Sequence, residues 1–286
     1  MSAILHRMLR PGLRHALPIG LLLAVGFAAP LVIVLGYSLA EPRSFDLLSG
    51  PTLANYRTIF GETYYISFLW SLCFALLAVI ILAAICYPVA YGLARVFGPW
   101  ANLVTLLFVI PLFVSENVRL FGWTLFFIKG GVLQGGMLAL FGLEMQTLLF
   151  KPPIIVFGMV YVYLPFMLFP MTLGLSMVPR EVTEAAADLG GNRWQVFREV
   201  ELPLAMPGIV IGMLLTFVLG VGALAEARIL GGQSIIPIAH DIEIAFTYAQ
   251  NWPLGAALSV LLVLLVGFLV LTVLRRLDLD RILGRR

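Results

Sequence analysis

The chain has 286 residues, of which 61% are hydrophobic and only 12% are charged. Because soluble domains carry roughly a quarter charged residues, this composition excludes an ordinary soluble protein and indicates a chain that crosses a membrane several times. The formal net charge is +3 and no basic run is interleaved with aromatic residues, so the sequence gives no indication of nucleic-acid binding.

Six apolar segments are predicted to cross the membrane as helices, so the fold class is an all-α membrane protein. They cover about residues 17–39, 66–94, 101–128, 152–178, 207–225 and 254–274. Together with their connections they form one transmembrane domain over residues 17–274, flanked by short tails at 1–16 and 275–286.

The first segment contains 23 residues without a charge, and as a helix it is about 34 Å long, which is enough to span a membrane. A cleaved signal peptide is the alternative. The apolar core of a signal peptide has roughly 7–15 residues, so we expect this longer segment to be retained as a span.

Charges and prolines mark the third and fourth segments. Glu116 and Arg119 interrupt the third segment, and Pro165 and Pro170 are expected to kink the fourth. The glycine-rich connection between these segments, residues 129–151, is predicted to contain a short helix at the outer surface.

Small residues recur every four positions in the fifth segment, at Gly208, Gly212, Thr216 and Gly220. Such a row lets helix backbones approach closely. We expect this face to pack within the chain, and contact with a partner subunit is the alternative.

The longest hydrophilic run between two apolar segments covers residues 184–203, and the loop that contains it, residues 179–206, is called the elbow below. Pro179 sits where a helix can begin, because its missing N–H is not needed there. Gly190 and Gly191 are predicted to stop that helix, because glycine adopts the left-handed conformation at little steric cost. The elbow therefore consists of two predicted short helices joined at these glycines.

The second short helix has its own start and stop signals. Asn192 can cap it, and Gln195 stands three residues further on, as in a capping box. The helix is predicted to end at Leu202, because the residue before Pro203 is pushed out of helical geometry.

Apolar side chains give the second helix a stripe, since Trp194, Phe197 and Val200 recur at helical spacing. Ala185, Ala186 and Ala187 keep one surface of the first helix flat. A loop of this kind either lies on lipid headgroups or docks into a groove on a partner protein, and these patterns leave both interpretations open.

Seven residues of the elbow resemble the EAA loop of the membrane subunits of ATP-binding-cassette importers: Glu184, Ala185, Ala186, Gly190, Val200, Leu202 and Pro203. The resemblance implies a type I importer permease fold, the MetI-like fold, with six transmembrane helices and a cytoplasmic coupling-helix loop. It also implies that the elbow, including Trp194 and Phe197, inserts into a cleft of an ATPase subunit.

The same resemblance implies the partners: a second permease subunit, two cytoplasmic ATP-binding subunits and a soluble substrate-binding protein. ATP and magnesium would then be bound by the partner ATPases, because the only lysines, Lys129 and Lys151, stand in no phosphate-binding P-loop. We expect no cofactor in this chain and no enzymatic activity of its own.

Positive charges predict the orientation in a bacterial inner membrane. With the elbow and both termini inside, the inner segments hold twelve arginines and the outer segments hold six arginines and lysines. This bias follows the positive-inside rule and predicts a cytoplasmic elbow independently of the family resemblance.

Charged residues near the outer ends of the spans are candidates for the substrate path: Glu116, Arg119, Glu226, Asp241 and Glu243. Structural ion pairing is the alternative interpretation, because charges at membrane depth are usually paired. The excess of acidic residues would favour a cationic solute.

Two segments, 115–123 and 252–259, are similar to the third-span exit and the last-span start of spermidine/putrescine-type permeases. The resemblance implies a polyamine or a related cationic solute. Opine, amino-acid-derived and aminophosphonate importers share much of this architecture and remain alternatives. A secondary transporter is the alternative of another class, and its coupling-ion site would require convergent carboxylates near the membrane centre.

Overall fold

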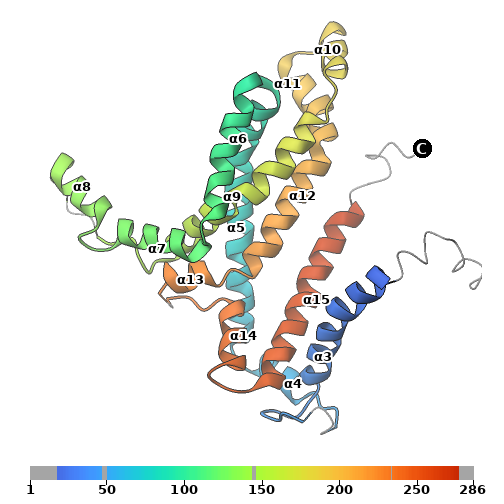
Figure 1. Ribbon diagram of the computed structural model, residues 1–286, viewed down its shortest axis with the longest axis vertical. Coiled ribbons are helices and arrows are strands. Elements are labelled where there is room, and N and C mark those ends of the chain that lie inside the picture. The colour runs from blue at the N-terminus through green and yellow to red at the C-terminus, as the bar shows by residue number, and fades with distance from the viewer. Residues whose placement is uncertain (1–17, 47–49, 144–145, 233, 277–286) are drawn as a thin grey trace, which may run out of the picture. The chain divides into compact units, whose positions relative to one another are not determined.

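The computed structural model describes residues 18–46, 50–143, 146–232 and 234–276, and every regular element among them is a helix (Figure 1). The predicted N-terminal tail, the first residue of the first predicted span and residues 277–286 of the predicted C-terminal tail lie outside the described residues. Six described helices are long and apolar enough to cross a membrane: Pro18–Ser38, Tyr64–Val96, Glu116–Phe141, Pro152–Ser176, Arg193–Val221 and Trp252–Arg275.

The chain divides into two compact units. The smaller unit contains Met1–Thr63 and Asp241–Leu264, and the larger contains Tyr64–His240 and Leu265–Arg286. Helices α14 (Ile238–Phe246) and α15 (Trp252–Arg276) begin in one unit and end in the other.

Three long helices form the core of the larger unit: α5 (Tyr64–Tyr91), α9 (Pro152–Ser176) and α12 (Leu202–Val221), which lie side by side (Figure 1). Small residues allow their close approach. A Cβ on Gly208 would collide with the backbone of Pro170 and Gly174, and one on Gly212 would lie 2.9 Å from the Met167 carbonyl oxygen. The predicted row of small residues thus packs within the chain, against α9, as expected.

The predicted third span, residues 101–128, is divided in the structure. Helix α6 (Ala101–Val109) continues into the 3₁₀ turn η4 (Ile110–Phe113), and the backbone is then extended at Val114 and Ser115. Two further helices, α7 (Glu116–Phe127) and α8 (Val132–Phe141), follow and lead away from the core (Figure 1).

Local chemistry explains this division. Pro111 cannot donate to an α-helical hydrogen bond, which favours the short 3₁₀ turn, and Glu116 suits the first turn of a new helix because of the helix dipole. Glu116 and Arg119 marked this interruption in the sequence, but the apolar residues that continue beyond them did not show that the helix ends before Glu116.

The elbow leads into the fifth span without a break. Helix α11 (Arg193–Gln195), the π-helix η5 (Val196–Glu201) and α12 form one continuous helix over Arg193–Val221. The predicted helix end at Leu202 is therefore wrong, since Leu202 has helical dihedrals of φ −62° and ψ −47°. The wider π turn ends just before Pro203, and such turns accommodate an irregular hydrogen-bond ladder.

The smaller unit holds the end of the first span, with π-helix η1 (Ala24–Ala28) and α3 (Ala29–Ser38), and the short helix α4 (Ala54–Gly61). The buried amide of Asn55 donates hydrogen bonds of 3.2 and 2.8 Å to the carbonyl oxygens of Ser38 and Ala40. The ring of Trp252, at the start of α15, packs edge-on against three aromatic rings, those of Tyr37, Phe45 and Phe246.

Candidate functional site

The elbow turns at two glycines, as the sequence predicts. Helix α10 (Arg180–Asp188) follows Pro179, and Gly190 has the left-handed dihedral φ +87°. The N–H groups of Gly190 and Gly191 donate to the carbonyl oxygens of Ala187 and Ala186, at 2.9 and 3.1 Å. These bonds satisfy the otherwise free carbonyls at the helix end and fix the direction of the turn.

The second half of the elbow begins with the predicted capping box. The Asn192 side chain accepts from the backbone N–H of Gln195, and the Gln195 side chain accepts from the N–H of Asn192, both at 2.9 Å. This reciprocal pair joins α10 and α11 through a defined turn instead of a flexible linker.

Two large apolar side chains project from this turn. Leu189 is 90% exposed and stands directly before the turn glycines, and Trp194 is 64% exposed and lies between the two capping residues. Glu184 and Ala185 are also exposed, whereas Ala186 is half-buried. Sequence reasoning missed Leu189, although its place beside the turn glycine was the signal that could have identified it.

The remaining elbow candidates lie on the continuous helix. Phe197 and Val200 are half-buried in η5, and Leu202 and Pro203 open α12. The Phe197 ring lies between Trp194, at 5.2 Å between centroids, and Tyr87 of α5, at 5.7 Å. The predicted apolar stripe thus has one exposed end, at Trp194, and one end that packs on the core.

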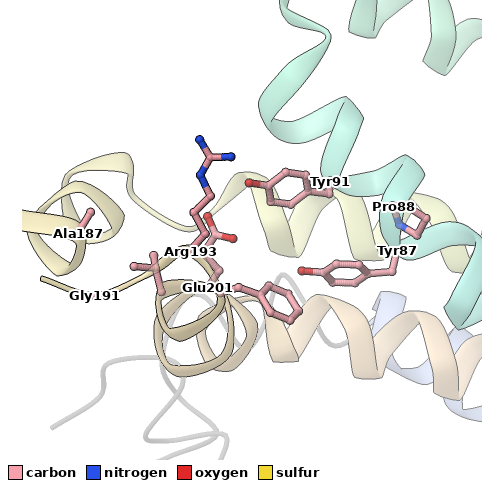
Figure 2. Close-up of a pocket in the computed structure, with 9 residues that line it drawn as sticks. Tyr87, Pro88, Tyr91, Ala187, Gly191, Arg193 and Glu201 are labelled. Carbon is pink, nitrogen blue, oxygen red and sulfur yellow. The ribbon is translucent and has the colours of Figure 1, made fainter.

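A cavity of about 600 Å³ separates the elbow from the end of α5 (Figure 2). Its polar lining consists of Tyr87 and Tyr91 from α5 and of Arg193 and Glu201 from the elbow. The nearby connection between α5 and α6 is fastened to the start of the elbow, because Arg95 donates a hydrogen bond of 2.7 Å to the Val178 carbonyl oxygen.

A second cavity, of about 590 Å³, lies between α7, α9, α12 and the short helix α13 (Ala225–Ile229). Its polar side chains are Glu116, Asn117, Tyr163 and Arg228. Sequence reasoning missed Tyr163, because a tyrosine within an apolar run carries no local signal of a cavity.

Glu226 lies behind this cavity and is fully buried. Its side chain packs against Gly158 of α9, and neither carboxylate oxygen has a hydrogen bond of normal geometry among the described residues. Burial, reinforced by the negative charge of Glu116, raises the pKa of Glu226 to about 7, although Tyr163 and Arg119 favour its ionised form. A carboxyl group of this kind holds its proton near neutral pH.

The other residues predicted to line the substrate path lie outside this cavity. The Arg119 guanidinium lies over the ring of Tyr161, 5.6 Å from the centroid. Asp241 and Glu243 are half-buried on α14 and belong to the smaller unit. The larger unit thus brings together Glu116 and Glu226 but contains neither of these two carboxylates.

Metal binding finds no support in the part of the chain that the structure describes. Within it, no three side chains among histidine, cysteine, aspartate and glutamate lie close enough to share an ion.

Comparison with known proteins gives a family match and close relatives. Residues 87–282 match the family described as binding-protein-dependent transport system inner membrane component. The spermidine/putrescine transport system permease protein PotB of Escherichia coli (strain K12) is 31% identical over 221 residues, which are 77% of this chain and 80% of that protein. PotB of Haemophilus influenzae is 30% identical over 260 residues, 90% of each chain.

A solved structure shares the fold. A chain of a bacterial ABC transporter involved in the import of the acidic polysaccharide alginate superposes with a TM-score of 0.72 and 16% sequence identity. The alignment covers 96% of this chain and 99% of that chain. At this identity the likeness concerns the fold alone.

Proposed function

The chain belongs to the family of binding-protein-dependent transport system inner membrane components and is the permease subunit of an ATP-binding-cassette importer; from this premise we propose that it imports a polyamine or a closely related organic cation. It is a multi-pass protein of the inner membrane. The family does not favour the alternative of a secondary transporter.

The observation that carries the coupling role is the exposed apolar pair on the rigid turn of the elbow. Leu189 and Trp194 present their side chains outward, while the hydrogen bonds of the glycine turn and the capping box hold the backbone around them. Exposed apolar anchors on a rigid support are typical of a docking surface. The elbow then inserts into a groove of an ATPase subunit on the cytoplasmic side, with both termini of the permease on that side.

The proposed partners follow from this role. ATP and magnesium bind to two ATPase subunits, a soluble binding protein delivers the solute from outside, and a second permease subunit completes the translocation pathway. Closure of the ATPase pair moves the elbow, and the continuous helix Arg193–Val221 transmits that motion directly to the fifth span.

The relatives support a cationic solute, because those named above are spermidine/putrescine permeases. The second cavity offers one carboxylate to an ammonium group, that of Glu116, and the cationic Arg228 lines the same cavity. Asp241 and Glu243 remain proposed path residues on the basis of their charge, and opines, amino-acid-derived solutes and aminophosphonates remain less favoured alternatives.

Purification from the native membrane followed by reconstitution tests the proposal. We expect an ATPase with a P-loop, a second six-span permease and ATP-dependent uptake of radiolabelled putrescine into proteoliposomes. Copurification of these partners with uptake of an anionic solute instead would overturn the substrate proposal and keep the permease assignment. Isolation of a stable homo-oligomer without an ATPase would overturn the proposed coupling role.

A further inference from the structure

The cavity between the elbow and α5 contains a hydroxyl group without a partner. The Tyr87 side chain is half-buried and its ring packs on Phe197. Its hydroxyl oxygen is buried and has no hydrogen bond to any residue that the structure describes. Buried hydroxyl groups in proteins are nearly always hydrogen-bonded, because desolvation without a partner is unfavourable. The Tyr87 hydroxyl is therefore available to a polar side chain that reaches it across the cavity.

A suitable acceptor lines the same cavity. Glu201 is half-buried at the last position of η5 and lines the same cavity as Tyr87. Figure 2 shows the hydroxyls of Tyr87 and Tyr91 directed toward the side of the cavity where Glu201 and Arg193 lie. A phenol that donates to a carboxylate makes one of the stronger hydrogen bonds in proteins.

The backbone that carries Glu201 belongs to a π-helix, an irregular turn of a kind that is frequent at functional sites. A return of this turn to the α-helical register would rotate the elbow about the helix axis relative to α12. The cavity of about 600 Å³ between the two elements leaves room for that rotation.

We propose that Tyr87 and Glu201 form a latch, in which movement of the elbow brings the Glu201 carboxylate to the Tyr87 hydroxyl and fastens the elbow to α5. Tyr87 is then a positioning residue for transport, because through it the movement of the elbow acts on α5 as well as on α12. The latch rests on the proposed coupling role of the elbow.

Cross-linking tests the movement without reference to any solute. In the full complex, with Cys73 and Cys86 replaced by alanine, Tyr87→Cys and Glu201→Cys are combined and oxidised. We expect the disulfide yield to rise severalfold when the ATPase is trapped with ATP and vanadate. An equal yield in the trapped and resting complexes overturns the latch.

Conservative variants test the hydrogen bond itself. Tyr87→Phe keeps the ring contact with Phe197 and removes only the hydroxyl, so assembly and melting temperature should be retained. We expect the amount of solute imported per ATP hydrolysed to fall roughly tenfold, as for the loss of a hydrogen bond to a charged group. Glu201→Gln should act similarly, and the double variant should be no worse than either single one.

The outcomes separate the latch from the function on which it rests. The latch is overturned if the losses of solute imported per ATP hydrolysed add up in the double variant. It is also overturned if neither single variant changes this amount. Tyr248→Phe, on an exposed tyrosine of the smaller unit, is the matched control. A parent complex that imports no putrescine but shows the trapped-state increase in cross-linking overturns the substrate proposal and supports the latch.

Discussion

The ring of Phe197, in the elbow, packs edge-on against the ring of Tyr87 at the end of α5, with 5.7 Å between centroids and 73° between planes. This pair joins the part of the chain proposed to bind the ATPase to a helix of the transmembrane core. Edge-to-face aromatic pairs contribute about 0.5–1.5 kcal/mol beyond the apolar area that they bury.

Replacement of Phe197 by alanine should weaken transmission of the ATPase motion to α5. We expect the ATPase to remain bound, because Leu189 and Trp194 are unchanged, while stimulation of ATP hydrolysis by the loaded binding protein falls severalfold. The measurement is stimulated and basal ATPase activity of the reconstituted complex. Stimulation equal to that of the parent complex would show that the contact transmits nothing.

Replacement of Trp194 by alanine should instead weaken binding of the ATPase. Its side chain is 64% exposed, so the melting temperature of the permease should change little. If Trp194 is an anchor in the ATPase groove, affinity should fall by about 2 kcal/mol, or about thirtyfold. Titration of the purified ATPase against the permease in nanodiscs measures this, with Trp100→Ala, an exposed tryptophan outside the elbow, as the control.

Replacement of Gly190 by proline should prevent ATPase docking and leave membrane insertion intact. Proline fixes φ near −65°, whereas Gly190 has φ +87°, and proline also removes the N–H that donates to Ala187. Pull-down of the ATPase by the variant measures docking, and protease protection measures insertion. Gly136→Ala, at a helical glycine with open space around it, is the control. If Gly190→Pro pulls down as much ATPase as the parent permease does, the turn is not required for docking.

Stability should depend on pH through Glu226. Its pKa is about 7 in the folded protein and 4.5 as the reference value, so the folded state binds the proton more tightly. Stability is therefore highest below about pH 4.5, falls as the pH rises toward 7, and is constant above that window, with a total loss on the order of 3 kcal/mol. Melting curves in detergent across this range measure the effect.

The Glu226→Gln variant supplies the comparison, because glutamine is neutral at every pH. Its melting temperature should lack the decrease between about pH 4.5 and 7, while the exposed Glu62→Gln control should keep the parent profile. A parent profile that is flat, or that rises with pH across this window, would show that Glu226 is ionised in the folded protein.

Replacement of Gly208 by a larger residue should destabilise the packing of α12 against α9. A Cβ at this position collides with backbone atoms of Pro170 and Gly174, so α9 and α12 must separate. We expect Gly208→Ala to cost about 1–3 kcal/mol, the usual range for overpacking, as measured by thermal unfolding in detergent. Gly267→Ala, where nothing lies within 4 Å, should leave the unfolding temperature unchanged.

The sequence by itself determined the features that depend on neighbouring residues. Composition and the length of the apolar runs specified a helical membrane protein, because each span must satisfy its own backbone hydrogen bonds. The turn at Gly190 and the capping box of Asn192 and Gln195 were also predictable, because they involve residues within a few positions of one another. The family pattern of the elbow lies in the same short segment.

Tertiary structure alone decided the features that depend on residues far apart in the chain. One local feature also needed the structure: the helix continues through Leu202 because a π turn precedes Pro203, and the preference of the residue before proline for extended geometry does not predict such a turn. Glu226 is buried because Gly158, 68 positions earlier, leaves space for its side chain, and Tyr87 meets Phe197 from another helix. Burial and unmet hydrogen bonds arise from packing between helices, so the sequence pattern of any one helix does not specify them.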